Sequence, residues 1–162
     1  MKNLVVVLVL AITVSSCVST AIVKSPEAMS SIVLTEDDKD TNFIKANEWM
    51  VENFNNAESV IQFTDKEAGI IKGKYLMKAG FYQPKSQYSS EIKTEATYAI
   101  ITLRVRDNKA KIEIALASKT YTQVKYGGKV ITATPEELKS RGILLMEEFE
   151  TAMKNTSANK DW

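Results

Sequence analysis

The hydrophobic pattern begins with an apolar run at the N-terminus. Residues 4–14 are apolar except for Thr13, and the basic Lys2 precedes them. A run of this length suits the hydrophobic region of a signal peptide, whereas a membrane-spanning helix needs about 20 apolar residues. We therefore interpret residues 1–16 as an export signal that is removed.

This run ends in Val14-Ser15-Ser16-Cys17, which fits the lipobox of bacterial lipoproteins. Small residues let the signal peptidase approach the backbone, and the thiol of Cys17 accepts the diacylglyceryl group. Two or more acyl chains anchor a protein stably, at about 0.8 kcal/mol per buried CH₂. The alternatives are a secretory signal with an incidental cysteine and a buried free thiol, but Cys17 is the only cysteine in the chain.

The residues after Cys17 bear on location and domain organisation. Val18 replaces the aspartate typical of inner-membrane retention, and residues 18–23 contain no acidic cluster. We therefore expect a lipid anchor in the outer membrane with the protein facing the periplasm, and surface display as the alternative. We expect a lipidated tether at 17–28, one domain at 29–155 and a polar tail at 156–162.

The first periodic segments predict a strand followed by a helix. Residues 29–34 form a short strand-like run, and Thr35 and Asp38 are spaced like a capping pair at the start of a helix. The predicted helix runs to Phe54 and buries the stripe Phe43, Ala46, Met50 and Phe54, widened by Ile44, Trp49 and Val51.

Four strands and a second helix follow. The strands are predicted at 59–63, 70–78, 92–106 and 110–118, with turns at 65–69 and 107–108, a loop at 79–91 and a later turn at Gly127-Gly128. Thr134, Pro135 and Glu137 then predict a helix start with a capping box. That helix carries the stripe Leu138, Leu145, Phe149 and Met153, with Gly142 as a potential kink.

The resulting order, β-α-β4-α, predicts an α+β fold. A four- or five-stranded antiparallel sheet would carry both helices on one face and leave the other face open. Trp49 and the run from Asp65 to Lys74 (Asp-Lys-Glu-Ala-Gly-Ile-Ile-Lys-Gly-Lys) resemble an uncharacterised bacterial domain family with a TBP-like fold. Its members are typically secreted or lipidated, and it is common in Bacteroidota. The resemblance implies the same element order and assigns no activity, so no functional residues carry over.

Two interpretations compete for the acidic part of that motif. Asp65 and Glu67 invite a metal or catalytic hypothesis, but two alternating carboxylates are too few for a calcium loop. The favoured interpretation is a hairpin turn in which Gly69 supplies a positive φ and the acids face solvent.

The residue inventory limits the chemistry of the chain. It contains no histidine, so Ser-His, Cys-His and His-metal sites are excluded, and it lacks phosphate-loop and dinucleotide glycine motifs. We therefore expect no enzyme, no cofactor and no metal. A Ser-Lys enzyme and a hydrolase that works through carboxylates remain as alternatives, and the hydrolase would require Asp65 or Glu67 to lie in a cleft.

Charge is segregated along the chain. Residues 66–129 contain 13 Lys and Arg against 5 Asp and Glu, whereas residues 17–65 contain 3 against 9. Alternation in the long hairpin places six residues on the face opposite the core: Tyr98, Ile100, Thr102, Arg104, Lys111 and Glu113. This pattern indicates a mixed basic and apolar binding surface. The alternative is a solvated sheet face whose lysines protect edge strands from aggregation.

We therefore favour a noncatalytic cell-envelope lipoprotein whose open sheet face binds a peptide, a lipid headgroup or a protein partner. The alternative is a structural or assembly subunit that uses the same face for protein contact, including a homodimer. TBP itself binds DNA on its open face, but fold does not imply function, and we expect no nucleic acid outside the cytoplasm.

Overall fold

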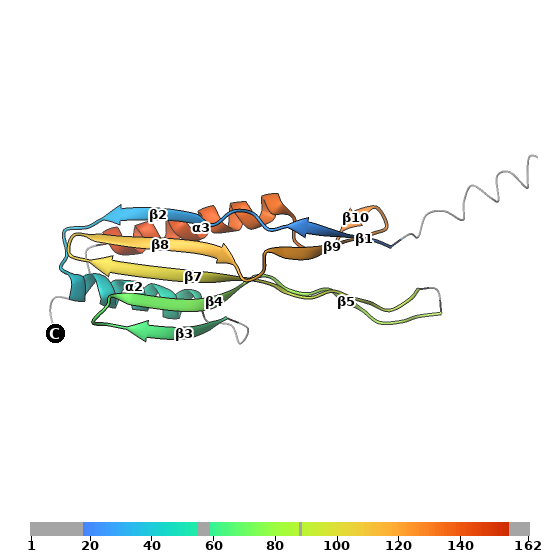
Figure 1. Ribbon diagram of the computed structural model, residues 1–162. Helices are drawn as coiled ribbons and strands as arrows, with labels where there is room; N and C mark the ends of the chain where they lie inside the picture. The colour runs from blue at the N-terminus through green and yellow to red at the C-terminus, as the bar shows by residue number, and fades with distance from the viewer. Residues whose placement is uncertain (1–17, 55–58, 88, 156–162) are drawn as a thin grey trace, which may run out of the picture.

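The computed structural model describes residues 18–54, 59–87 and 89–155 (Figure 1). The expected export signal at 1–16, the expected lipidation site Cys17 and the expected tail at 156–162 lie outside the described residues. Among the helices that are described, none is both long enough and apolar enough to cross a membrane.

A five-stranded antiparallel sheet forms the centre of the fold. Its strand order is β2-β8-β7-β4-β3, and each neighbouring pair is antiparallel. The strands are β2 (Met29–Leu34), β3 (Val60–Asp65), β4 (Ile70–Lys78), β7 (Thr97–Arg106) and β8 (Lys109–Leu116). The tight turn expected between β7 and β8 is confirmed, and Asn108 adopts a φ of 60° within it.

Both helices lie on the same face of this sheet. α2 (Lys39–Asn53) and α3 (Pro135–Lys154) are behind the strands in Figure 1. Their apolar side chains join the inward side chains of the strands in one core, where the rings of Trp49 and Phe149 meet edge-on at 5.2 Å between centroids. The predicted α+β class is confirmed, and the main sheet with its two helices follows the predicted β-α-β4-α order.

The helical stripes are buried largely as the periodicity predicts. On α3, Leu138, Leu145, Phe149 and Met153 are all buried. On α2, the expectation that Ile44 and Val51 widen the buried face is wrong, because both are exposed. Each residue turns a helix by about 100°, and α3 covers the Trp49 side of the stripe rather than theirs.

The N-cap of α3 is the predicted residue, whereas the N-cap of α2 is not. α3 begins with the predicted capping box, since Glu137 N donates to Thr134 Oγ1 and Thr134 N donates to Glu137 Oε2. The predicted start of the first helix at Thr35 is wrong: the N-cap is Asp38, whose carboxylate accepts from Thr41 N at 2.7 Å. Thr35 N instead donates to the carbonyl of Asn108, which holds residue 35 beside the β7–β8 turn.

A second sheet lies at one end of the molecule. It contains β1 (Ser19–Lys24), β9 (Thr120–Tyr126) and β10 (Lys129–Val130), in the order β1-β9-β10. Within the expected lipidated tether at 17–28, Ser19–Lys24 forms a strand that pairs along its whole length with β9. The expected turn at Gly127-Gly128 is confirmed and joins β9 to β10.

A short two-stranded arm extends from the ends of β4 and β7 (Figure 1). It pairs β5 (Tyr82–Gln83) with β6 (Ile92–Lys93), so part of the predicted loop is a ladder. The strand expected over residues 92–106 is interrupted between β6 and β7, which lets the arm leave the main sheet.

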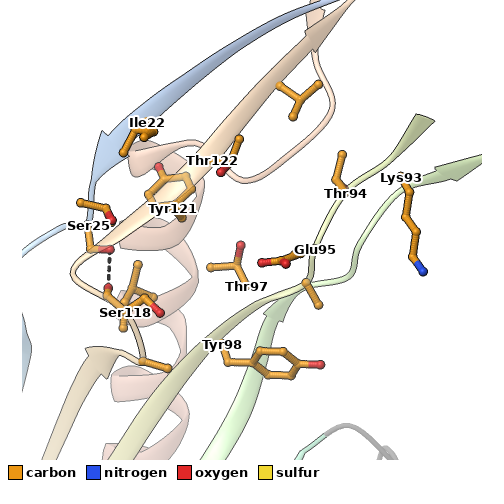
Figure 2. Close-up of a pocket in the computed structure, with 15 residues that line it drawn as sticks. Ile22, Ser25, Lys93, Thr94, Glu95, Thr97, Tyr98, Ser118, Tyr121 and Thr122 are labelled. Carbon is orange, nitrogen blue, oxygen red and sulfur yellow. Dashed lines mark hydrogen bonds between the residues drawn. The ribbon is translucent and has the colours of Figure 1, made fainter. Parts of the chain in front are cut away.

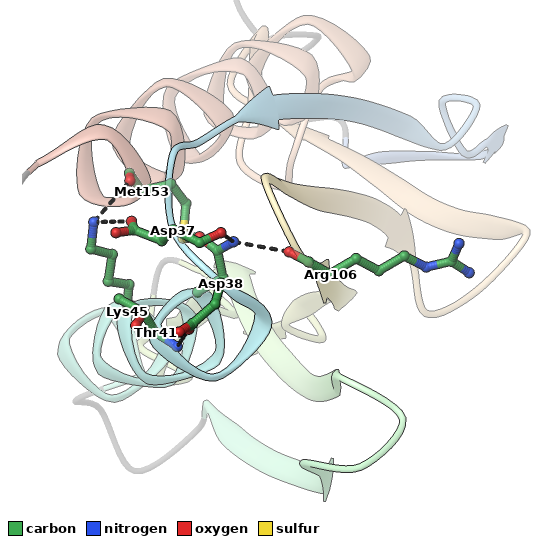
Figure 3. Close-up of polar contacts among 7 residues, drawn as sticks. Asp37, Asp38, Thr41, Lys45, Arg106 and Met153 are labelled. Carbon is green, nitrogen blue, oxygen red and sulfur yellow. Dashed lines mark hydrogen bonds and ion pairs between the residues drawn. The ribbon is translucent and has the colours of Figure 1, made fainter.

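A polar cluster joins α2, α3 and the β7–β8 turn (Figure 3). Lys45 Nζ donates to the carboxylate of Asp37 and, at 3.4 Å, to the carbonyl of Met153. Asn42 Nδ2 donates to the carbonyl of Asp37 at 3.1 Å and to that of Arg106 at 2.9 Å. These bonds satisfy carbonyl groups next to the start of α2 and at the ends of β7 and α3, so the cluster fixes how the helices meet the sheet.

Candidate functional site

The open face is the side of the five-stranded sheet that points away from the helices. Cross-strand pairing arranges its outward residues in rows that cross all five strands. One row is Ser30, Glu113, Thr102, Lys72 and Phe63, and the next is Ile32, Lys111, Arg104, Ile70 and Asp65. Among the described residues, no helix covers this face.

Positive charge dominates the open face. Its cations are Lys72, Lys74, Arg104, Arg106, Lys109 and Lys111, and its carboxylates are Asp65 and Glu113. Lys111 pairs with Glu113 at 3.2 Å. Within the described part of the chain, no carboxylate forms an ion pair with Lys72, Arg104, Arg106 or Lys109. The face therefore keeps a positive potential that attracts anionic groups.

Apolar side chains lie among these cations. Ile32 and Leu34 on the edge strand β2 are 64% and 74% exposed, and Phe63 on the opposite edge strand β3 is 49% exposed. Lys74 Nζ lies 3.8 Å from the centroid of the Tyr98 ring, a cation–π contact. Exposed apolar residues beside unpaired cations suit a partner that is both acidic and partly apolar.

All six residues predicted for the binding surface lie on the open face. Thr102 pairs with Glu113, Arg104 pairs with Lys111, and Tyr98 and Ile100 continue along β7. Their shared face confirms the alternation, while their role in binding stays a prediction.

Sequence reasoning missed the neighbours that complete the face, namely Lys72, Lys74, Arg106, Lys109, Ile32, Leu34 and Phe63. Alternation along residues 70–78 places Lys72 and Lys74 on one face of their strand. The sequence pattern could therefore have identified these two residues. Ile32 and Phe63 join it only through the order of the strands, which no local pattern records.

The acidic motif between β3 and β4 forms a turn. Asp65 Oδ1 accepts from Ala68 N at 2.9 Å, Glu67 is exposed, and Gly69 has a φ of 66°. The hairpin-turn interpretation of this motif therefore agrees with the geometry. Within the described ranges, no group of three or more acidic or cysteine side chains gathers as metal ligands.

A cavity of about 420 Å³ lies between the second sheet and the base of the arm (Figure 2). Hydroxyl groups dominate its lining: Ser25, Thr94, Thr97, Ser118, Thr120, Thr122, Tyr98 and Tyr121. Figure 2 shows Glu95 directed toward Thr97, whereas Lys93 points away. This lining can hydrogen-bond a polar ligand. Sequence reasoning missed it because the lining residues come from separate segments without a shared motif.

The Tyr121 hydroxyl at this cavity is buried and has no hydrogen-bond partner. Burial raises the pKa of Tyr121 above its ordinary value, and the carboxylates of Glu136 and Glu137 raise it further. Ionisation therefore favours the unfolded chain above about pH 10, so the stability present below that pH is lost as pH rises through the folded pKa.

We expect Tyr121→Phe to leave the free energy of unfolding at pH 7 unchanged or to raise it by up to about 1 kcal/mol. The variant should also lose less stability than the wild type between about pH 9 and about pH 11, because it lacks the tyrosine hydroxyl whose pKa folding raises. Urea unfolding at about pH 7, about pH 9 and about pH 11 measures the two effects. If the variant is clearly less stable at pH 7, the Tyr121 hydroxyl makes a stabilising hydrogen bond, which would contradict this expectation.

Comparison with known protein families identifies one match for this chain. Residues 30–119, more than half of the chain, match the family described as "Domain of unknown function (DUF4468) with TBP-like fold". The chain has no match among curated proteins.

Two solved bacterial structures are similar to this one. A DUF4468 family protein from Bacteroides ovatus is 14% identical with a TM-score of 0.50, and the match covers 83% of this chain and 93% of that one. A TBP-like protein from Parabacteroides distasonis is 15% identical with a TM-score of 0.48, and the match covers 80% of this chain and 94% of that one. At such identities the first likeness shows the fold alone.

Proposed function

This chain belongs to the family of domains of unknown function with a TBP-like fold (DUF4468), and we propose that it is a noncatalytic cell-envelope lipoprotein whose open sheet face binds an acidic protein. The lipid on Cys17 would anchor it in the outer membrane, on the periplasmic side. The observation that carries the proposal is the uncovered sheet face with six cations against two carboxylates.

The distribution of that charge favours a macromolecular partner. The cations are spread over β4, β7 and β8, and the exposed apolar residues lie on the edge strands β2 and β3. A small ligand would reach only a few of them, whereas a protein surface can meet all five strands. Two copies that met through this face would bring like charges together, which costs free energy. An envelope location makes an acidic protein a better candidate than nucleic acid.

Photo-crosslinking from the centre of the face tests this proposal. A photoreactive amino acid at Thr102, in the full-length protein produced in its own bacterium, should form adducts with an acidic protein after illumination. Arg104→Glu combined with Lys111→Glu should reduce those adducts by about tenfold, because it replaces attraction with repulsion at the middle of the face.

A matched variant distinguishes an effect of charge on the open face from an effect of the net charge of the whole protein. Lys139→Glu with Lys154→Glu makes the same change in net charge on the exposed side of α3, and it should leave the adducts unchanged. Both double variants should keep the stability of the wild type within about 1 kcal/mol, because all four side chains are at the surface. Adducts that persist in the Arg104/Lys111 variant would contradict a role for the open face.

A further inference from the structure

The end of the molecule that carries β1 is the end nearest to Cys17. β1 begins at Ser19, two residues after Cys17, and it pairs with β9 from its first residue. Two residues reach at most about 7 Å. If Cys17 carries lipid, the second sheet therefore begins within that distance of the lipid attachment, and no flexible tether separates the two.

Three structural features project from this end (Figure 1). They are the start of β1, the β9–β10 turn at Gly127-Gly128, and the arm formed by β5 and β6. Figure 1 shows that the arm extends from the main sheet in the same direction as the start of β1, whereas the β7–β8 turn lies at the opposite end. The long axis of the main sheet runs between these two ends.

The chemistry of the projecting end suits an anionic surface. Lys125 and Lys129 flank the β9–β10 turn, and Lys85 and Lys93 lie on the arm. The arm also carries exposed Glu91 and, at its base, Glu95. Tyr82 on the arm is 61% exposed, and tyrosine is a residue type that favours the interface between lipid and water.

We propose that this end of the protein, with the β9–β10 turn and the arm, rests on an anionic phospholipid surface. The lysines meet the negative headgroups, and Tyr82 on the arm lies at the headgroup level. This inference depends on the proposed lipid anchor and goes beyond it, because a lipid alone does not orient a domain. The strands then stand upright on the membrane, and the open face points sideways, where a periplasmic partner can reach it.

Fluorescence quenching in vesicles tests the orientation. The mature acylated protein is placed in vesicles of phosphatidylethanolamine and phosphatidylglycerol that contain a quencher on some headgroups. A fluorophore is attached through Lys85→Cys, Lys129→Cys or Lys109→Cys, and the lipid on Cys17 prevents labelling there. We expect about threefold stronger quenching from positions 85 and 129 than from position 109, which lies at the far end. Equal quenching at the three positions would overturn the proposal.

Charge reversal tests the surface chemistry. Lys125→Glu with Lys129→Glu should reduce quenching at position 85 by about twofold or more, and so should replacement of the anionic lipid by phosphatidylcholine. Lys139→Glu with Lys154→Glu serves as the matched control and should change nothing. Quenching that is indifferent to both changes would overturn an electrostatic contact with lipid.

Mass spectrometry of the Cys17 peptide distinguishes failure of the proposed lipid anchor from failure of the proposed orientation. An unacylated Cys17 would overturn both the anchor and this orientation. Acylation with equal quenching would overturn the orientation alone. Crosslinking at Thr102 reports on the open face in either case, since it does not involve the projecting end.

Discussion

Gly69→Ala is expected to lower the free energy of unfolding by about 2–5 kcal/mol. Gly69 has a φ of 66°, where an alanine pays about 1–2 kcal/mol. Its new Cβ would also lie 2.4 Å from the carbonyl oxygen of Val105, so backbone would have to move at a further cost of about 1–3 kcal/mol. Urea unfolding followed by circular dichroism measures the change.

Gly127→Ala separates these two costs. Gly127 has a φ of 55°, but a Cβ built there meets no atom within 4 Å. It should therefore lose only the conformational part, about 1–2 kcal/mol. If the two variants were equally destabilised, the close approach of Val105 would contribute nothing to the loss. That result would contradict tight packing of the β3–β4 turn against β7.

Asp37→Ala is the second change for which we expect a large loss of stability, about 2–3 kcal/mol. Lys45 is only 7% exposed, and the carboxylate of Asp37 is its charged partner. Without Asp37, the ammonium group keeps only the carbonyl of Met153 at 3.4 Å. A buried cation without a counter-charge carries an uncompensated cost of desolvation.

Lys45→Met should cost less, about 1 kcal/mol or below, although it breaks the same ion pair. It leaves Asp37, which is 27% exposed and can be solvated. The double variant Asp37→Ala with Lys45→Met should recover most of the loss caused by Asp37→Ala alone. Thermal unfolding of the three variants gives the comparison, and equal losses in both single variants would contradict the asymmetry in burial.

The candidate site was predictable wherever one strand contained the whole signal. Alternation in residues 92–106 placed Tyr98, Ile100, Thr102 and Arg104 on one face, and the structure puts them there. The net positive charge of residues 66–129 likewise predicted a basic sheet. The contribution of Ile32 and Phe63 was not predictable, because it depends on β2 and β3 forming the two edges of the sheet.

The errors in the fold share a physical cause. β1 has no buried alternation, since five of its six residues are exposed, and it is a strand because β9 lies beside it. Thr35 and Asp38 are both good N-cap residues, and local spacing favoured the first. The contact between Thr35 and Asn108, 73 positions later in the chain, selects the second.

By itself, the sequence determined the features whose free energy comes from neighbours along the chain. These include the periodic stripes of the helices, the capping box at Thr134, the turn at Gly69 and the alternating faces of the long hairpin. Only the tertiary structure decided which strands are edges, where α2 begins, and that the second sheet and the arm extend from the same end. Those choices depend on hydrogen bonds and burial between distant segments, and such contacts leave no periodic trace in either segment alone.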